Sequence, residues 1–148
     1  MNKVLFSSEK MDWTTPQDFY DELDAESGFT LDPASSDDNH KCAKYFTKEQ
    51  DGLKQSWSGE TVFCNPPYGR DVGKWVKYAY EQHTAHGCTI VMLVAARTDT
   101  RWFHDYVYGK AAEIRFVKGR LKFGDGKDSA PFPSMVVVYR KNDTDVGR

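Results

Sequence analysis

Four consecutive residues, Asn65-Pro66-Pro67-Tyr68, have the types and the order that could do chemistry. An amino group conjugated to a purine is a poor nucleophile, because its lone pair is delocalised into the ring. Two hydrogen-bond acceptors aimed at its N–H bonds favour the pyramidal geometry that attacks a methyl sulfonium. The Asn65 side-chain oxygen and the Pro66 carbonyl can be these acceptors, and proline stiffens the loop without adding an N–H donor. We interpret this NPPY motif, with Pro67 as part of its rigid backbone, as a catalytic loop for methyl transfer to an aromatic amine.

Two neighbours of these acceptors have different expected roles. Tyr68 offers a flat face on which a base extruded from a duplex can stack. Cys64 is expected to be a small buried side chain in a strand and not a nucleophile. The alternative interpretation of NPPY is a rigid turn around a packed tyrosine. Its place between a strand and an amphipathic helix favours the catalytic interpretation, because sites in α/β sheets lie at the carboxyl ends of strands.

The elements that position this loop follow from the apolar pattern. Residues 61–64 predict a strand that the two prolines stop. Apolar residues between Val72 and Tyr80 recur at helical spacing, which predicts an amphipathic helix that ends near Gly87. Residues 89–94 form a continuous apolar run, which is typical of a central strand covered on both faces.

The remaining elements are shorter. Residues 14–26 predict a helix, with Thr15 as a capping residue and Pro16 at the first helical position. The other expected elements are a strand stub over 29–31 ending in Asp32-Pro33, a short strand at 45–46, a helix over 99–108, and late strands over 114–117 and 135–139, with a further strand over 120–123 left open. The order predicts an α/β fold whose sheet is mostly parallel with a late antiparallel pair. We expect one domain over 1–148, with its core at about 12–140.

Composition narrows the class of protein. The chain has 148 residues and three widely spaced cysteines without a Cys/His cluster, so we expect neither a zinc site nor a disulfide framework. No histidine has ligand-like spacing, and no metal is expected. The sequence has no apolar run long enough to span a membrane and no secretory signal at its start, so a cytosolic protein is expected.

Charge is unevenly distributed along the chain, although its net value is only -2. Residues 9–60 hold thirteen acidic and five basic residues, whereas residues 97–122 hold seven basic and three acidic ones. A polyanion would be steered toward the second segment. The alternative is an ordinary solvated surface of mixed charge.

Several motifs in order carry a resemblance over roughly residues 12–140. They are Trp13-Thr14-Thr15-Pro16, Phe29-Thr30-Leu31-Asp32-Pro33-Ala34, Asn39-His40-Lys41-Cys42, Tyr45-Phe46-Thr47, Asp51-Gly52-Leu53, Cys64-Asn65-Pro66-Pro67-Tyr68-Gly69, residues 95–103 (AARTDTRWF), residues 119–123 (GRLKF) and residues 130–134 (APFPS). Through this ordered set of motifs, the chain resembles the phage-type DNA N6-adenine methyltransferases, the Dam family. NPPY is the most specific piece, and the ordered set carries the rest.

The resemblance implies a Rossmann-like fold that uses S-adenosyl-L-methionine and methylates adenine N6 at specific sites in double-stranded DNA, without a separate target-recognition domain. It implies that Asp32-Pro33 takes the place of the first cofactor motif, which usually has a glycine-rich turn that is absent here. Asp51 resembles the acidic residue that holds the cofactor's adenine, and Thr15-Pro16 the segment beside its methionine end. Asn65 is expected to border the cofactor as well. The implied location is the cytoplasm of a bacterial host of a phage or prophage.

Four basic residues are candidates for DNA binding: Arg97, Arg101, Arg120 and Lys122. Arg97 follows a strand at the edge expected to carry NPPY, and the alternative is a surface arginine. The other interpretation of the long connection over 119–133 is a plain hairpin. The oligomeric state is open, and a homodimer would let so small a domain cover more DNA.

Two rival functions remain open at this point. NPPY alone also suits methyl transfer to adenine in RNA or to a protein glutamine. The degenerate first cofactor motif also suits a non-catalytic remnant that binds the cofactor or DNA.

Overall fold

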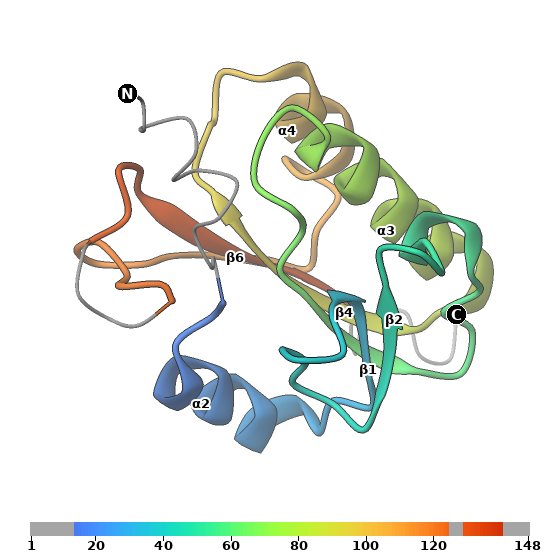
Figure 1. Ribbon diagram of the computed structural model, residues 1–148. Coiled ribbons are helices and arrows are strands. Elements are labelled where there is room, and N and C mark those ends of the chain that lie inside the picture. Colours follow the sequence, from blue (N-terminus) through green and yellow to red (C-terminus); the bar gives the residue numbers. More distant parts are fainter. Residues whose placement is uncertain (1–13, 125–128, 141–148) are drawn as a thin grey trace.

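The computed structural model describes residues 14–124 and 129–140, in which one sheet has the strand order β2-β1-β3-β4-β6-β5 (Figure 1). The first four strands in the chain are parallel, and β6 pairs antiparallel with both β4 and β5. The strands are β1 (Leu31–Ser35), β2 (Lys44–Thr47), β3 (Thr61–Cys64), β4 (Thr89–Ala95), β5 (Glu113–Phe116) and β6 (Ser134–Tyr139). The predicted α/β class, with a parallel centre and a late antiparallel pair, is confirmed.

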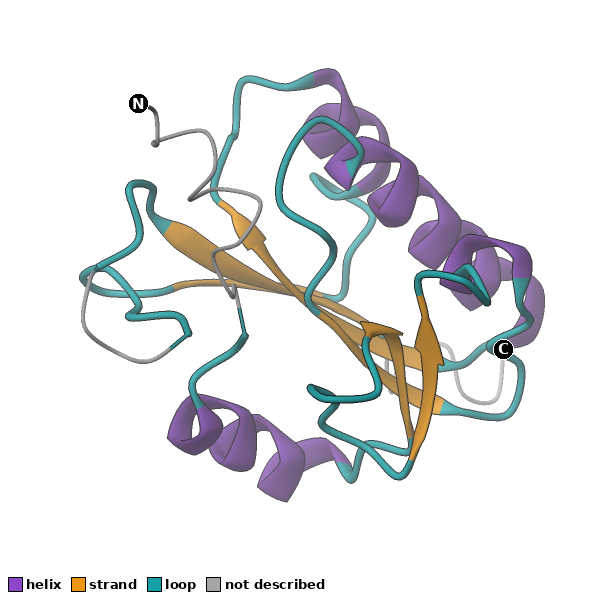
Figure 2. Ribbon diagram, in the orientation of Figure 1, coloured by secondary structure: helices purple, strands orange, loops and turns teal. Residues whose placement is uncertain are grey.

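Helices lie on both faces of the sheet (Figure 2). Helix α2 (Gln17–Ser27) covers one face, and α3 (Val72–His86) and α4 (Arg101–Tyr106) cover the other. The connections that flank β2 carry only one 3-10 turn, η1 (Gly52–Lys54). The sheet is therefore covered by fewer helices than a doubly wound fold has, and the Rossmann-like assignment stays a prediction.

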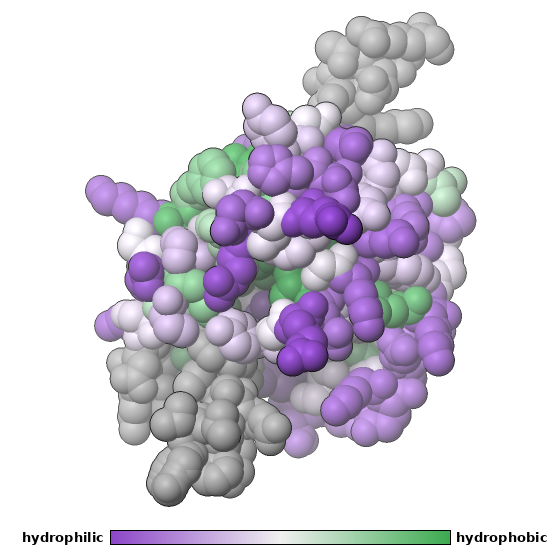
Figure 3. Space-filling view, turned by 90° about the horizontal axis from the view of Figure 1, so that it is seen from above, coloured by the Kyte–Doolittle hydropathy of each residue, from purple (hydrophilic) through white to green (hydrophobic). Residues whose placement is uncertain are grey.

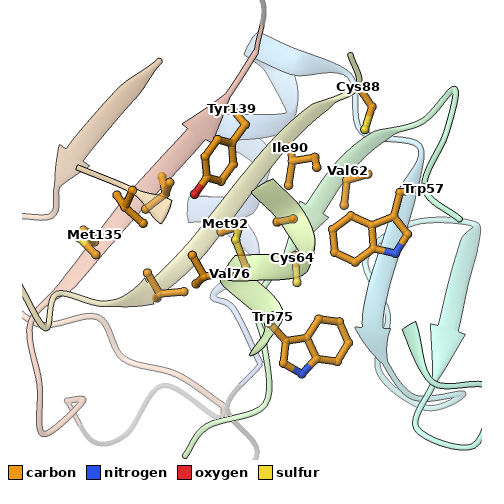
Figure 4. Packing of buried hydrophobic residues seen from close by; sticks show 14 of the residues in the cluster. Trp57, Val62, Cys64, Trp75, Val76, Cys88, Ile90, Met92, Met135 and Tyr139 are labelled. Carbon is orange, nitrogen blue, oxygen red and sulfur yellow. The ribbon is translucent and has the colours of Figure 1, made fainter. Parts of the chain in front are cut away.

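The core lies on both sides of β4, as its continuous apolar sequence predicts. Ile90, Met92 and Val94 pack in the cluster under α3 and α4, which includes Trp75 and Val76 (Figure 4). The alternate residues Val91 and Leu93 pack in the cluster that contains α2 residues. This alternation follows from the two-residue period of a strand. It fixes β4, and with it β3 beside it, between two packed layers.

Helix α2 is held by Tyr20 and Leu23, which are buried. The Tyr20 ring lies edge-on to Phe63 of β3, with ring centroids 5.1 Å apart. The prediction that Thr15 caps this helix is wrong. Pro16 is the N-cap residue instead, and no side chain caps the helix. The Thr15 hydroxyl points to another partner, described below.

Strand β1 also differs from its prediction. It does not end at Asp32-Pro33 but runs through both residues to Ser35. A proline fits there because the pairing of β1 with β2 shifts register between Asp32 and Ser35. Residues 120–123 form no strand, so the further strand left open for them is absent. None of the helices in 14–124 and 129–140 has the length and apolarity needed to cross a membrane.

Candidate active site

The loops that follow the parallel strands gather at one edge of the sheet. The chain passes from β1 to β2 on one side and then returns to β3 on the other side of β1, so the direction of strand addition reverses between β1 and β3. Ligand sites in α/β sheets lie outside the carboxyl ends of strands at such a reversal. The NPPY loop begins at this point, because Asn65 follows Cys64, the last residue of β3.

Two cavities flank this loop. The larger has a volume of about 750 Å³ and the smaller about 330 Å³. Asn65, Pro66 and Tyr68 line both of them, while Pro67 lines the larger one. The loop is therefore a wall shared by two spaces. In the view from above, hydrophilic side chains surround a small recess with hydrophobic atoms at its base (Figure 3).

The larger cavity brings together most of the residues predicted to bind a cofactor. Thr15, Asp32, Pro33 and Asp51 line it together with Asn65, although they come from four separate segments of the chain. Pro16 does not line it. Its carbonyl accepts a hydrogen bond from the Tyr20 N–H at the start of α2. Trp13 lies outside the described residues.

Asp32 is the buried charge of this cavity. Its carboxyl is only 5% exposed and accepts hydrogen bonds from the backbone N–H groups of Lys41, at 2.8 Å, and Ala34. Burial raises the pKa of Asp32 to about 6, and these two bonds oppose part of that rise. A buried carboxylate that is ionised at neutral pH suits a cationic or hydroxyl-bearing ligand.

Asp51 and Gly52 form the turn that closes this cavity beyond β2. Asp51 has φ 58°, in the left-handed region, and its side chain accepts a hydrogen bond from the Leu53 N–H at 3.0 Å. A Cβ at Gly52 would lie 2.3 Å from the Pro33 carbonyl oxygen, so only glycine fits there. The close approach of this turn to β1 thus depends on a glycine after β2. The glycine-rich turn that is usual in the first cofactor motif would follow β1 instead.

The Asn65 side chain reaches back to the segment before α2. Its Nδ2 donates a hydrogen bond of 3.0 Å to the hydroxyl oxygen of Thr15. The sequence analysis predicted that both residues border the cofactor, but it gave no reason to expect a bond between them. Cys64, just before Asn65, is fully buried, and burial raises the pKa of its thiol well above the ordinary value. A nucleophilic thiolate is therefore disfavoured at this position.

The smaller cavity is lined by aromatic rings. Tyr68 is 44% exposed and stacks on Phe132, with centroids 5.4 Å apart and an interplanar angle of 14°. Phe123 lies beside Phe132 with a centroid distance of 6.1 Å, and both line the cavity. Trp102 is half-buried, packs against the core cluster and lines this cavity too. Neither phenylalanine had a predicted role, although both lie in the long connection over 119–133 and in motifs of the family resemblance.

The four predicted DNA-binding residues are exposed. Arg97 lines the smaller cavity, and Arg101 is the first residue of α4. Arg120 and Lys122 lie on the connection between β5 and β6, where the Arg120 guanidinium donates to the Ala130 carbonyl at 3.3 Å. Arg70, which was not predicted, also lines the smaller cavity.

One basic residue of the 97–122 segment is already neutralised. Arg115 forms ion pairs with Glu26 and Glu113, each at 2.7 Å. The positive charge offered to a polyanion is therefore smaller than the residue count suggests. Within the part of the chain that the structure describes, no group of three His, Cys, Asp or Glu side chains could hold a metal ion.

Comparison with known proteins identifies the family of this chain. The family described as DNA N-6-adenine-methyltransferase (Dam) matches residues 3–146. The DNA N-6-adenine-methyltransferase of Escherichia phage T1 is 37% identical over 112 residues, which are 74% of this chain and 45% of that protein. The protein of the same name from Haemophilus phage HP1 (strain HP1c1) is 31% identical over 140 residues, which are 89% of this chain and 80% of that protein. The chain thus spans less than half the length of the first relative and four fifths of the second, and it belongs to the DNA N-6-adenine-methyltransferase (Dam) family.

Proposed function

We propose that this protein transfers a methyl group from S-adenosyl-L-methionine to the N6 amino group of adenine in double-stranded DNA, with the NPPY loop as its catalytic element. The observation that carries the proposal is the loop's position between two cavities, both of which Asn65, Pro66 and Tyr68 line. A donor in one cavity and an acceptor in the other would thus both contact this loop. Family membership and the names of the phage relatives support adenine in DNA as the acceptor.

The larger cavity fits the cofactor. Its volume of about 750 Å³ lies in the range of small-molecule sites. The buried Asp32 carboxylate suits the ammonium group or the ribose hydroxyls of S-adenosyl-L-methionine, and we assign Asp51 to the cofactor's adenine. When bound, S-adenosyl-L-methionine supplies an electrophilic methyl carbon on a sulfonium.

The two acceptors of the loop act on the adenine amine. The Asn65 side-chain oxygen and the Pro66 carbonyl each accept one N–H of that amine, which favours its pyramidal and nucleophilic form. Pro66 is buried, and prolines at 66 and 67 limit the movement of the backbone, so the carbonyl is held in place. Acceptors fixed before the reaction need no reorganisation in the transition state.

The smaller cavity suits the base. An extruded adenine needs aromatic surface to replace the stacking that it loses in the duplex. Tyr68, Phe132 and Trp102 offer that surface. The exposed Arg97, Arg101, Arg120 and Lys122 suit the phosphates on either side of the extruded nucleotide. The phage relatives support action in the cytoplasm of a bacterial host.

Tritium-labelled S-adenosyl-L-methionine, offered in parallel with unmethylated duplex DNA, RNA and protein, tests the proposal. We expect the label in DNA, and after digestion to nucleosides we expect it in N6-methyladenine. Asn65→Ala serves as the inactive control. Faster labelling of RNA or protein, or no labelling at all, would contradict the proposal.

A further inference from the structure

We propose that Thr15 is a positioning residue, which holds the side-chain amide of Asn65 in the orientation that methyl transfer requires. This inference rests on the proposed function of the NPPY loop. The contact that carries it joins residues that lie fifty positions apart in the chain.

The geometry of the contact sets the orientation of the amide. The Thr15 hydroxyl oxygen accepts from Asn65 Nδ2 at 3.0 Å, so the amide oxygen Oδ1 lies on the opposite edge of the same planar group. A half-turn of the side chain about its Cβ–Cγ bond would exchange Oδ1 and Nδ2 with almost no change in shape. In the exchanged state a donor would face the N–H groups of the substrate amine. Because a hydroxyl can donate as well as accept, the bond to Thr15 holds this edge of the amide in place, and the accepting role that Thr15 has here leaves Oδ1 on the edge away from Thr15.

The anchor itself is held firmly. Thr15 is only 3% exposed. Its neighbour Thr14 accepts two hydrogen bonds, one at its hydroxyl from Asn39 and one at its carbonyl from the Gly124 N–H at 3.1 Å. These bonds tie the segment to the loop after β1 and to the connection between β5 and β6.

Helix α2, which follows Thr15, helps to place Thr15 beside Asn65. Pro16 is the N-cap of α2, and Tyr20 of that helix packs on Phe63, two residues before Asn65 in the chain. The start of α2 and the end of β3 therefore keep a fixed spacing. Since no side chain caps α2, the Thr15 hydroxyl is not needed to start the helix. Its bond to Asn65 is thus separable from its contribution to the fold.

Steady-state kinetics of Thr15→Val and Thr15→Ser test the inference. The valine variant keeps the shape of the side chain and removes the hydroxyl, so we expect kcat to fall about tenfold or more, because a small misplacement of a catalytic group has effects of that order. The serine variant keeps the hydroxyl, and we expect it to restore kcat to within about threefold of the original. We expect KM for the cofactor and for DNA to change less than kcat in both.

A matched control is available on the surface of α3. Thr84→Val removes a hydroxyl that bonds only to the Glu81 carbonyl one turn away, far from the NPPY loop in the fold. We expect its kcat and its melting temperature to equal those of the original protein. Melting temperatures of the Thr15 variants identify any general loss of folding.

The side-chain amide protons of Asn65 give a second measurement that needs neither cofactor nor DNA. Their NMR signals are assigned by their absence in Asn65→Ala. We expect Thr15→Val to shift these signals and to speed their exchange with water, and Thr15→Ser to preserve them.

The outcomes separate this inference from the proposed function. A Thr15→Val protein with full kcat, or with unchanged Asn65 amide signals, would overturn the positioning role alone. A loss of kcat with unchanged amide signals would also overturn it, because Thr15 would then act through the cofactor. An original protein that methylates no adenine in DNA would overturn the proposed function, and the catalytic part of this inference with it.

Discussion

The two cavities beside the NPPY loop share a wall but differ in chemistry. The larger is lined by three aspartates (Asp32, Asp51 and Asp71) and by three lysines (Lys41, Lys48 and Lys74), and of these six residues only Asp32 is buried. The smaller contains aromatic rings and the guanidinium groups of Arg70 and Arg97. One short loop therefore faces a space of mixed charge that holds a buried carboxyl and a space lined by aromatic rings and arginines.

This difference indicates which reactant each cavity can bind. A sulfonium cofactor with an ammonium group is stabilised beside carboxylates, whereas a flat base on a polyanion is stabilised by rings and arginines. The reverse assignment would place phosphates beside the buried carboxyl of Asp32.

The largest effect is expected at the shared wall itself. Asn65→Ala removes an acceptor that acts mainly in the transition state, so we expect kcat to fall about 100-fold to 1,000-fold. We expect the dissociation constant of the cofactor to change by less than about threefold. Methyl-transfer kinetics and calorimetry measure the two quantities. Near-normal turnover would remove Asn65 from its assigned role.

Tyr68 tests the aromatic side of the contrast. Tyr68→Ala removes a stacking surface, and we expect kcat/KM for DNA to fall about tenfold to 100-fold, in line with the loss of one stacked base. Tyr68→Phe keeps the ring and is expected to stay within about threefold. Equal losses in the two variants would show that the hydroxyl matters and not the ring. Cofactor affinity serves as the control and should be nearly unchanged.

Asp32 tests the acidic side through pH. Its pKa is raised to about 6, and in the proposed complex the ionised form holds the ammonium group or the ribose hydroxyls of the cofactor. Affinity for S-adenosyl-L-methionine should therefore weaken about tenfold between pH 7.5 and pH 5, as the ionised fraction falls. Asp32→Asn should bind more weakly at pH 7.5 and lose most of this dependence. A pH-independent affinity in the original protein would contradict the assignment.

The contribution of Asp32 to the stability of the free protein should increase as the pH falls, whereas the affinity for the cofactor should decrease. A buried carboxyl with a raised pKa stabilises the fold when protonated, below the ordinary pKa of about 4. That contribution is lost as the pH rises through about 6. Urea unfolding at several pH values, with Asp32→Asn as the comparison, measures it. The difference between the two proteins should change steadily between pH 4 and pH 7, and a constant difference would count against the burial of the charge.

The smallest effect is expected at the exposed cations. Lys122→Ala should weaken DNA binding a few-fold and reduce the slope of log affinity against log salt by about one, because one phosphate contact is lost. Arg120→Ala should do the same. Lys77→Ala, which removes an exposed lysine on α3, is the control that should keep the full slope. An unchanged slope in Lys122→Ala would remove that residue from the DNA contact.

Sequence alone predicted the elements that local patterns determine. The strand over Thr61–Cys64 was predicted to the residue, because two prolines stop it. Helix α3 and its end at Gly87 followed from apolar spacing and from a glycine that takes the left-handed conformation, φ 73°. The course of β1 could not be predicted, since Pro33 normally ends a strand and only the register shift against β2 accommodates it.

Contacts between distant residues limited the prediction of the site. The role proposed for Asn65 follows from the chemistry of its side-chain amide, whereas the roles proposed for Asp32 and Asp51 follow from the family resemblance. The bond between Thr15 and Asn65, the stacking of Tyr68 on Phe132 and the closeness of Gly52 to Pro33 depend on how separate segments pack. No local sequence pattern predicts such pairs. Phe132 therefore had no predicted role, and Thr15 was wrongly predicted to cap α2.

A crystal structure of the protein with S-adenosyl-L-homocysteine and a DNA duplex tests whether the two cavities bind the cofactor and the base. The duplex contains a sequence that the protein methylates, with its adenine still unmethylated. We predict the cofactor product in the larger cavity beside Asp32. We predict an extruded adenine in the smaller one, with N6 within hydrogen-bond distance of Asn65 Oδ1 and the Pro66 carbonyl. An adenine that stays stacked in the duplex, or one that enters the larger cavity, would contradict the account.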